Sequence, residues 1–257
     1  MREAPIPTML RRISQTFSAV VLAALLTMAG PAGATFADDD CPAARETRVP
    51  PIEEPAINID KHKKQLRAYH AGNYNDDIKL VFEDALAYVE RQRDNVTRPA
   101  IVLDIDETSL SNWPNIDADD FGFIKSGNCP LKSTFPCGFD AWIFEGRAAK
   151  IDAALVFFNA VRAKHIAVFF VTGRRDSQRS VTMRNLKRAG FKGWTGLRTR
   201  PDNDNEKSIV RFKSGARAKI EKDGYTIIAS IGDQQSDLDG GHLKCPFKLP
   251  NPYYFIP

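Results

Sequence analysis

The chain has 257 residues, of which 43% are hydrophobic and 26% charged, and its formal net charge is +4. This length is enough for one domain with a full core, and the composition is typical of a globular protein rather than a disordered one. Without residues 1–34, 33 basic and 31 acidic residues remain, a net charge of +2. Such a small excess predicts no binding to nucleic acid or to a membrane surface.

Residues 1–34 have the pattern of a secretory signal peptide. Arg11 and Arg12 precede an apolar stretch at 17–29 that is too short to span a bilayer, and Ala32-Gly33-Ala34 resembles a cleavage site. We therefore expect a periplasmic or secreted protein with no membrane segment in its mature form. The alternative is a segment that stays uncleaved and anchors the chain.

Export affects how the four cysteines are interpreted, because an even number in an oxidising compartment predicts two disulfides. Cys129 and Cys137 bracket a short loop that contains two prolines, so one pairing is a local bridge. That bridge would leave Cys41 to pair with Cys245 across the mature chain. Four cysteines allow three connectivities, so the other pairings stay open. No zinc site is expected, because the chain has no C-x-x-C motif and no neighbouring pair of histidines.

The mature chain begins with a polar, proline-rich segment, and residues 35–56 are interpreted as an extended arm. Residues 58–93 have a helical pattern interrupted at Gly72-Asn73, and apolar residues recur every three or four positions in the second half. An apolar strand is expected at 100–105. Residues 109–149 contain no long periodic element and are rich in aromatic residues. We expect them to form a cap-like insertion over the end of that strand, or a small satellite core with its own disulfide.

The rest of the chain alternates helices and strands. Helices are expected at 151–161, 181–190 and 208–222, and strands at 166–171, 194–197 and 225–231, while the tail from 247 is too rich in proline for a helix. This alternation predicts an α/β fold, a Rossmann-like three-layer sandwich with a parallel central sheet. In such sheets the ligand binds at the carboxyl ends of the strands.

Polar residues gather where these strands end. Asp104 and Asp106 follow the first strand and, as residues i and i+2, point to the same side of it. Two adjacent carboxylates repel each other, so the pair needs a cation or a bound proton. That combination can make one aspartate a nucleophile and the other an acid–base partner. An acidic turn without function is the alternative reading of these two residues alone.

Three later stretches make the functional interpretation stronger. Thr172-Gly173 follows a buried strand, where a hydroxyl and backbone N–H groups can hold phosphoryl oxygens. Lys213, near the start of a helix, could neutralise a phosphoryl group, and Lys219 is a weaker candidate for that role. Asp233 and Asp237 follow the last strand and would complete an acidic cluster. A hard divalent cation such as Mg²⁺ would stabilise such a cluster and also bind phosphate oxygens.

The order of these stretches resembles a known family. Asp-x-Asp-x-Thr at 104–108, Thr-Gly-Arg at 172–174, Lys-Ser at 213–214 and Gly-Asp-x-x-Ser-Asp at 232–237 are similar to the motifs of the haloacid dehalogenase (HAD) superfamily. The closer resemblance is to the subfamily IIIB acid phosphatases, which include relatives of vegetative storage proteins. It covers roughly residues 57–257 and implies the HAD fold there, with a helical segment before the first strand.

The resemblance also implies roles for the four aspartates. Asp104 would attack phosphorus and form an aspartyl-phosphate, and Asp106 would protonate the leaving alkoxide and then activate water. Mg²⁺ would bind Asp104, the backbone carbonyl of Asp106, and Asp233. Asp237 would orient the waters of the ion or bind it directly. Thr172, the amide of Gly173 and Lys213 would hold the phosphoryl oxygens.

The expected activity is therefore hydrolysis of small-molecule phosphomonoesters by an exported, Mg²⁺-dependent acid phosphatase, with no prediction for its oligomeric state. A 5′-nucleotidase of the same fold is the alternative within the enzyme class, and Trp113, Phe123, Trp142 or Phe144 would then stack on the base. A non-catalytic storage or binding protein is the alternative from another class. It is less favoured because the residues for the chemistry are all present.

Overall fold

The computed structural model describes residues 40–51, 58–131 and 136–256. The chain divides into two units, Met1–Ala32 and Gly33–Pro257, and only the second contains described residues. The expected signal peptide and the beginning and end of the expected arm lie outside these ranges. Within them, no helix combines the length and the apolar character that crossing a bilayer requires.

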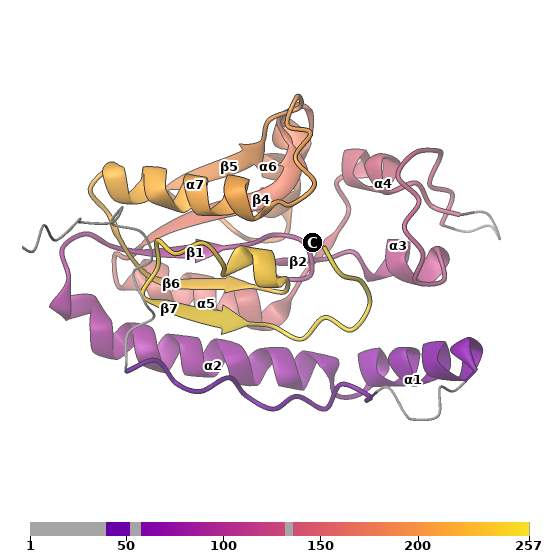
Figure 1. Ribbon diagram of the computed structural model, residues 1–257, viewed down its shortest axis with the longest axis horizontal. Coiled ribbons are helices and arrows are strands. Elements are labelled where there is room, and N and C mark those ends of the chain that lie inside the picture. The colour runs from indigo at the N-terminus through magenta and orange to yellow at the C-terminus, as the bar shows by residue number, and fades with distance from the viewer. Residues whose placement is uncertain (1–39, 52–57, 132–135, 257) are drawn as a thin grey trace, which may run out of the picture. The chain divides into compact units, whose positions relative to one another are not determined.

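A five-stranded sheet forms the centre of the second unit, in the order β5-β4-β1-β6-β7 (Figure 1). Every pair of neighbouring strands is parallel, with β1 in the middle between β4 and β6. The strands are β1 (Pro99–Leu103), β4 (Ala167–Arg175), β5 (Gly196–Arg200), β6 (Thr226–Gly232) and β7 (Cys245–Lys248). The parallel α/β fold expected from the sequence is confirmed.

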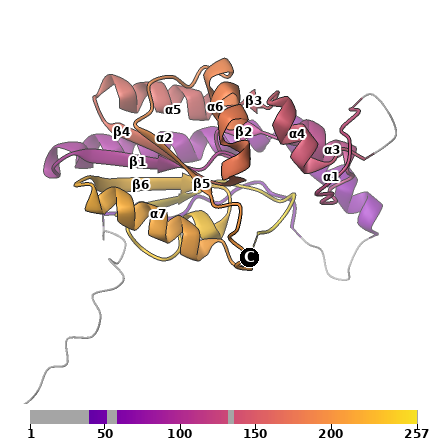
Figure 2. The same cartoon turned by 90° about the horizontal axis from the view of Figure 1, so that it is seen from above.

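Helices cover both faces of this sheet, as Figure 2 shows. One face carries α2 (Tyr74–Gln92), α5 (Asp152–Ala163) and α6 (Arg179–Arg188), and the other carries α7 (Val210–Lys222). Successive residues of β1 therefore enter two different cores: Ile101 and Leu103 pack on the side of α2 and α5, and Ala100 and Val102 on the side of α7. A continuous apolar run is what a strand buried on both faces requires.

The predicted break in the N-terminal helical segment is present. α1 (Ile59–Ala71) ends at Gly72, and α2 begins two residues later. α2 buries one apolar stripe against the sheet and α5, because its apolar residues recur at helical spacing. Short 3₁₀ helices connect other elements, at Arg93–Asn95, Asp176–Gln178 and Gln235–Asp237.

Residues 109–149 contain only short elements: β2 (Leu110–Ser111), α3 (Trp113–Ala118), α4 (Phe139–Glu145) and β3 (Ala149–Lys150). β2 and β3 pair in antiparallel fashion, so the two ends of this segment lie side by side. Its buried residues Ile116, Cys137 and Trp142 belong to the main apolar cluster. The apolar contacts of this segment are therefore continuous with the main core, and the segment also contains the Cys129–Cys137 disulfide.

Two strand predictions also need correction. The strand predicted at 166–171 continues as β4 to Arg175, with an irregular register between Thr172 and Arg175. β7 was not predicted, and it contains Pro246, which lacks the N–H of a regular ladder. β7 is an edge strand, and a proline is tolerated there.

The described part of the arm, residues 40–51, runs along α2 without helix or strand (Figure 1). Ion pairs of Arg45 with Asp84 and of Arg48 with Asp77 hold it there. The structure contains both disulfides suggested by the sequence: Cys41–Cys245 ties the arm to β7, and Cys129–Cys137 closes a loop before α4.

Candidate active site

Segments far apart in the sequence meet at the carboxyl ends of β1, β4 and β6. Asp104 and Asp106 directly follow β1, and Asp233 and Asp237 follow β6. Leu103 pairs with Phe170, so Thr172-Gly173 lies on the neighbouring strand at the level of the two aspartates after β1. Strands that run parallel bring their carboxyl ends to one edge, which is why the sequence could place these residues together.

Asp104, Asp233 and Asp237 form a buried acidic cluster, with carboxylate oxygens that all lie within 4.8 Å of one another. Each of these side chains is at most 5% exposed. Burial and the charge of Asp237 raise the pKa of Asp104 above its ordinary value and that of Asp233 to about 6. Three buried oxygen donors with an excess of negative charge are the ligand set that a hard divalent cation prefers.

Lys213, the fourth residue of α7, brings a positive charge into this cluster. Its Nζ donates a hydrogen bond to Oδ1 of Asp104 at 2.9 Å and another to Oδ1 of Asp237. Burial alone would lower the pKa of this ammonium group, but the two carboxylates raise it above its ordinary value. Lys213 is therefore charged, and one cation faces three carboxylates. Lys219, the weaker candidate, is exposed on the same helix.

Asp106 has a different set of partners. Nη2 and Nε of Arg174 donate to its Oδ1 at 2.7 and 3.0 Å, and Nδ2 of Asn112 donates to the same oxygen at 2.8 Å. Burial alone would raise the pKa of Asp106, but the charge and hydrogen bonds of Arg174 outweigh it and lower this pKa. The structure thus moves the pKa values of Asp104 and Asp106 in opposite directions, because the two carboxylates have different charged neighbours.

Sequence reasoning gave no role to Arg174, Asn112 or Glu107, although Arg174 and Glu107 lie inside the motif stretches and Asn112 follows the first of them by four residues. Arg174 is 3% exposed and Asn112 and Glu107 are 1% exposed. Glu107 accepts hydrogen bonds from the backbone N–H and the Nδ2 of Asn112, yet burial raises the pKa of its carboxyl to about 8. The motif spacing could have drawn attention to these positions, but it does not show where their side chains point.

The C-terminal tail also reaches this site, which the sequence did not predict. Nδ2 of Asn251, three residues after β7, donates to Oδ2 of Asp233 at 2.6 Å. Gln234 donates to the same oxygen at 2.6 Å, and the hydroxyl of Thr108 to the other at 3.2 Å. These donors fix the orientation of the Asp233 carboxylate.

The four aromatic residues considered for base stacking have different surroundings. Trp142 is 3% exposed, and its Nε1 donates to Oδ1 of Asn112 at 2.8 Å, so its ring has no room for a substrate. Trp113 already stacks on His70, with ring centroids 3.5 Å apart and an interplanar angle of 7°. Phe123 and Phe144 are exposed, at 72% and 53%.

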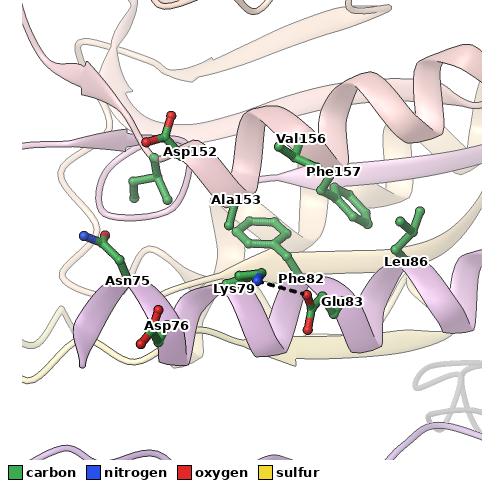
Figure 3. Close-up of a pocket in the computed structure, with 11 residues that line it drawn as sticks. Asn75, Asp76, Lys79, Phe82, Glu83, Leu86, Asp152, Ala153, Val156 and Phe157 are labelled. Carbon is green, nitrogen blue, oxygen red and sulfur yellow. Dashed lines mark ion pairs between the residues drawn. The ribbon is translucent and has the colours of Figure 1, made fainter. Parts of the chain in front are cut away.

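A groove of about 310 Å³ between α2 and α5 is a separate feature (Figure 3). Phe82 and Phe157 form its floor, and the ion pair between Lys79 and Glu83 lies along its rim. In the part of the chain that the structure describes, none of the clustered aspartates lines it. The groove is therefore not the candidate site.

Comparisons with known proteins agree on one group. The family model of the HAD superfamily, subfamily IIIB (Acid phosphatase), matches residues 48–257. Acid phosphatase 1 of Solanum lycopersicum is 33% identical over 194 residues, which is 74% of this chain and 73% of the relative. The Stem 28 kDa glycoprotein of Glycine max is 34% identical over 190 residues, covering 73% and 71%.

Two further similarities bear on the fold and on the range of functions. Vegetative storage protein 2 of Arabidopsis thaliana is 30% identical over 186 residues, covering 72% of this chain and 67% of the relative. The Class C acid phosphatase from Bacillus anthracis superposes with a TM-score of 0.58 at 22% identity, covering 75% of this chain and 86% of that structure. The superposition shows that the two share a fold.

Proposed function

The chain belongs to subfamily IIIB of the HAD superfamily, the acid phosphatases, and on this premise we propose that it is an exported, Mg²⁺-dependent enzyme that hydrolyses phosphomonoesters. Membership makes it a phosphoric monoester hydrolase. The observation that carries the finer proposal is the buried cluster of Asp104, Asp233 and Asp237 around Lys213. Export is supported by the signal-peptide pattern of residues 1–34 and by the two disulfides.

The acidic cluster fits the proposed ion. Its donors are all oxygens and they are buried together, and burial and the negative charge of Asp237 raise the pKa values of Asp104 and Asp233. We assign Asp104, Asp233 and the backbone carbonyl of Asp106 to Mg²⁺, with Asp237 orienting its waters or binding it directly. When bound, the ion would neutralise part of the charge on the phosphoryl group.

The two aspartates after β1 would carry the reaction. A carboxylate oxygen of Asp104 forms a bond to phosphorus while the ester P–O bond breaks, and the leaving oxygen takes a proton from Asp106. Water then attacks phosphorus and gives a proton to Asp106. The bond between Asp104 and phosphorus breaks, so phosphate is released and Asp104 is restored. Asp106 can take up the proton needed for the first step because a phosphoryl dianion beside it raises its pKa.

Thr172, the amide of Gly173 and Lys213 are proposed to hold the phosphoryl oxygens. Thr172 and Lys213 are buried at the same sheet edge, at 0% and 4% exposure. A Cβ on residue 173 would lie 2.7 Å from Cδ1, the flexible end of the Ile209 side chain, so a larger residue there would require Ile209 to move. Glycine avoids this contact.

Hydrolysis of p-nitrophenyl phosphate tests this proposal directly. The mature protein should be active with Mg²⁺, lose activity in EDTA and recover when Mg²⁺ is returned. Asp104→Asn should abolish turnover, whereas Asp239→Asn, at an exposed position on the loop after β6, should leave it within about twofold. Activity that survives Asp104→Asn would contradict the assignment of the nucleophile.

A panel of phosphomonoesters separates the two alternatives. A strong preference for nucleoside monophosphates over sugar and glycerol phosphates would identify a 5′-nucleotidase, for which only Trp113, Phe123 and Phe144 remain as stacking residues. No turnover of any phosphomonoester with Mg²⁺ present would favour a storage protein, a role that the name of Vegetative storage protein 2 assigns to that relative.

A further inference from the structure

Asn112 lies where the candidate site meets the inserted segment 109–149, and its side-chain amide is fully engaged. Nδ2 donates to Oδ1 of Asp106 at 2.8 Å and to Oε2 of Glu107 at 2.9 Å. Oδ1 accepts a hydrogen bond from Nε1 of Trp142 at 2.8 Å. With Asn112 at 1% exposure, protein atoms rather than solvent determine how this amide is oriented.

Trp142 determines which end of the amide faces the site. An indole nitrogen can only donate, so the amide oxygen must face Trp142 and the NH₂ group must face Asp106 and Glu107. The reverse orientation would place the amide oxygen against Asp106 and Glu107, and the NH₂ group against the indole N–H. Three lost hydrogen bonds and a carbonyl oxygen against the Asp106 carboxylate make that orientation unfavourable.

The amide distinguishes the two oxygens of Asp106. Oδ1 accepts from Asn112 and from two nitrogens of Arg174, at 2.8, 2.7 and 3.0 Å. Oδ2 has one contact among the described residues, the Nε of Arg174 at 3.2 Å. An oxygen that already accepts three hydrogen bonds is poorly placed to carry a proton, whereas the less occupied oxygen can exchange one.

We propose that Asn112 is a positioning residue for the general acid: it holds Oδ1 of Asp106 and leaves Oδ2 as the oxygen that exchanges the proton with the leaving group and with water. Trp142 sets the direction of Asn112, so the insertion contributes to proton transfer through α4. This inference rests on the proposed function, because it concerns the acid–base role of Asp106 in the same reaction.

The dependence of rate on the leaving group separates this role from a merely structural one. An alkyl phosphate such as glycerol phosphate releases a strongly basic alkoxide, which needs a proton in the transition state. p-Nitrophenolate is a weak base and leaves with little help. The ratio of kcat/KM values for the two substrates therefore reports how well Asp106 is positioned. A general loss of structure would lower both values together.

Trp142→Phe is the main test, because it keeps an aromatic ring in the core and removes the N–H donor; the loss of ring volume is matched by the Trp194→Phe control. One hydrogen bond is worth about 1 kcal/mol, so we expect kcat/KM for glycerol phosphate to fall about fivefold more than for p-nitrophenyl phosphate. Asn112→Ser, which removes the shared NH₂ group, should change the ratio by about 30-fold, less than the roughly 10²–10⁴-fold that general acid catalysis as a whole contributes. Trp194→Phe is the matched control, since Trp194 packs on Phe170 in the core, and it should leave the ratio unchanged.

The outcomes distinguish the inference from the function on which it rests. If Trp142→Phe and Asn112→Ser lower both kcat/KM values equally, or leave both unchanged, the positioning role is overturned while the phosphatase assignment stands. If Asp104→Asn keeps its activity, the proposed function itself fails. Thermal unfolding of each variant identifies any misfolded one, and Trp142→Phe decides the question alone if Asn112→Ser does not fold.

Discussion

Replacing Lys213 with methionine removes the ammonium group that Asp104 and Asp237 share, at nearly constant side-chain volume. Lys213 is 4% exposed, and both carboxylates that it contacts are at most 5% exposed, so water cannot replace its charge. Breaking a buried ion pair by removing one partner costs about 3–5 kcal/mol, because the other charge stays buried. We expect the free energy of unfolding of the metal-free protein at pH 7.5 to fall by about this amount.

The loss should depend on pH and on metal in a defined direction. Without the lysine the pKa values of Asp104 and Asp233, already raised, rise further. A carboxyl whose pKa is raised by folding contributes stability below its unfolded pKa and loses it as pH rises through the folded pKa. The deficit of the variant should therefore be smaller at pH 5 than at pH 7.5. Mg²⁺ should reduce the deficit at pH 7.5, because it supplies positive charge to the acidic cluster.

Urea unfolding followed by tryptophan fluorescence, at both pH values and with and without Mg²⁺, measures these differences. Lys219→Met is the control, because Lys219 is exposed on the same helix and its loss should change stability by less than about 0.5 kcal/mol. A deficit below about 1 kcal/mol for Lys213→Met at pH 7.5 without metal would refute the argument that its charge balances the cluster. So would a deficit that grows as the pH is lowered.

Three other perturbations test separate parts of the structure. Asn251→Ala removes a donor to Asp233 and should raise the Mg²⁺ concentration needed for half-maximal activity by about tenfold; an unchanged requirement would show that the tail does not tune the site. Burial lowers the pKa of His70 to about 4, so the folded protein excludes a proton that the unfolded chain binds, and stability should fall as pH drops from about 6.5 to about 4. His70→Phe should flatten that part of the stability–pH curve, and an unaltered curve would contradict the stated burial. Replacing Cys41 and Cys245 by serine should lower the free energy of unfolding by up to about 5 kcal/mol, because this disulfide closes the longer loop. Replacing Cys129 and Cys137 should lower it by about half as much, and equal losses in urea unfolding would contradict this.

The sequence was sufficient to predict the sheet and the cluster because both depend on regular geometry. Apolar runs such as 100–103 identify strands buried on two faces, and parallel strands bring the residues after them to one edge. Asp104 and Asp233 therefore could be placed together without any coordinates, whereas Lys213, which lies in a helix, was placed there by the resemblance to the HAD motifs. β7 escaped prediction because its pairing depends on a position at the sheet edge, which local sequence does not reveal.

The remainder of the site depends on side-chain partners that are distant in sequence. From the sequence alone, Arg174 could pair either with a phosphoryl group or with Asp106. Only the direction of its side chain in the fold shows that it pairs with Asp106. Trp142 was considered as a stacking surface, but a buried indole N–H needs an acceptor, and Asn112 provides it. Asn251 comes from a tail whose prolines indicated only the absence of a helix.

The Cys41–Cys245 disulfide makes the polypeptide between these residues a covalent ring. The two cysteines are 204 positions apart, so nearly all of the sheet, the insertion and every candidate catalytic residue lie within it. A protease that cuts one peptide bond inside the ring opens it without releasing a fragment. Such a nicked molecule would migrate as one species in gel electrophoresis without reductant and as two with it. This linkage would keep both halves of the active site together after a cut, which would be of use to a protein that is exported as we propose.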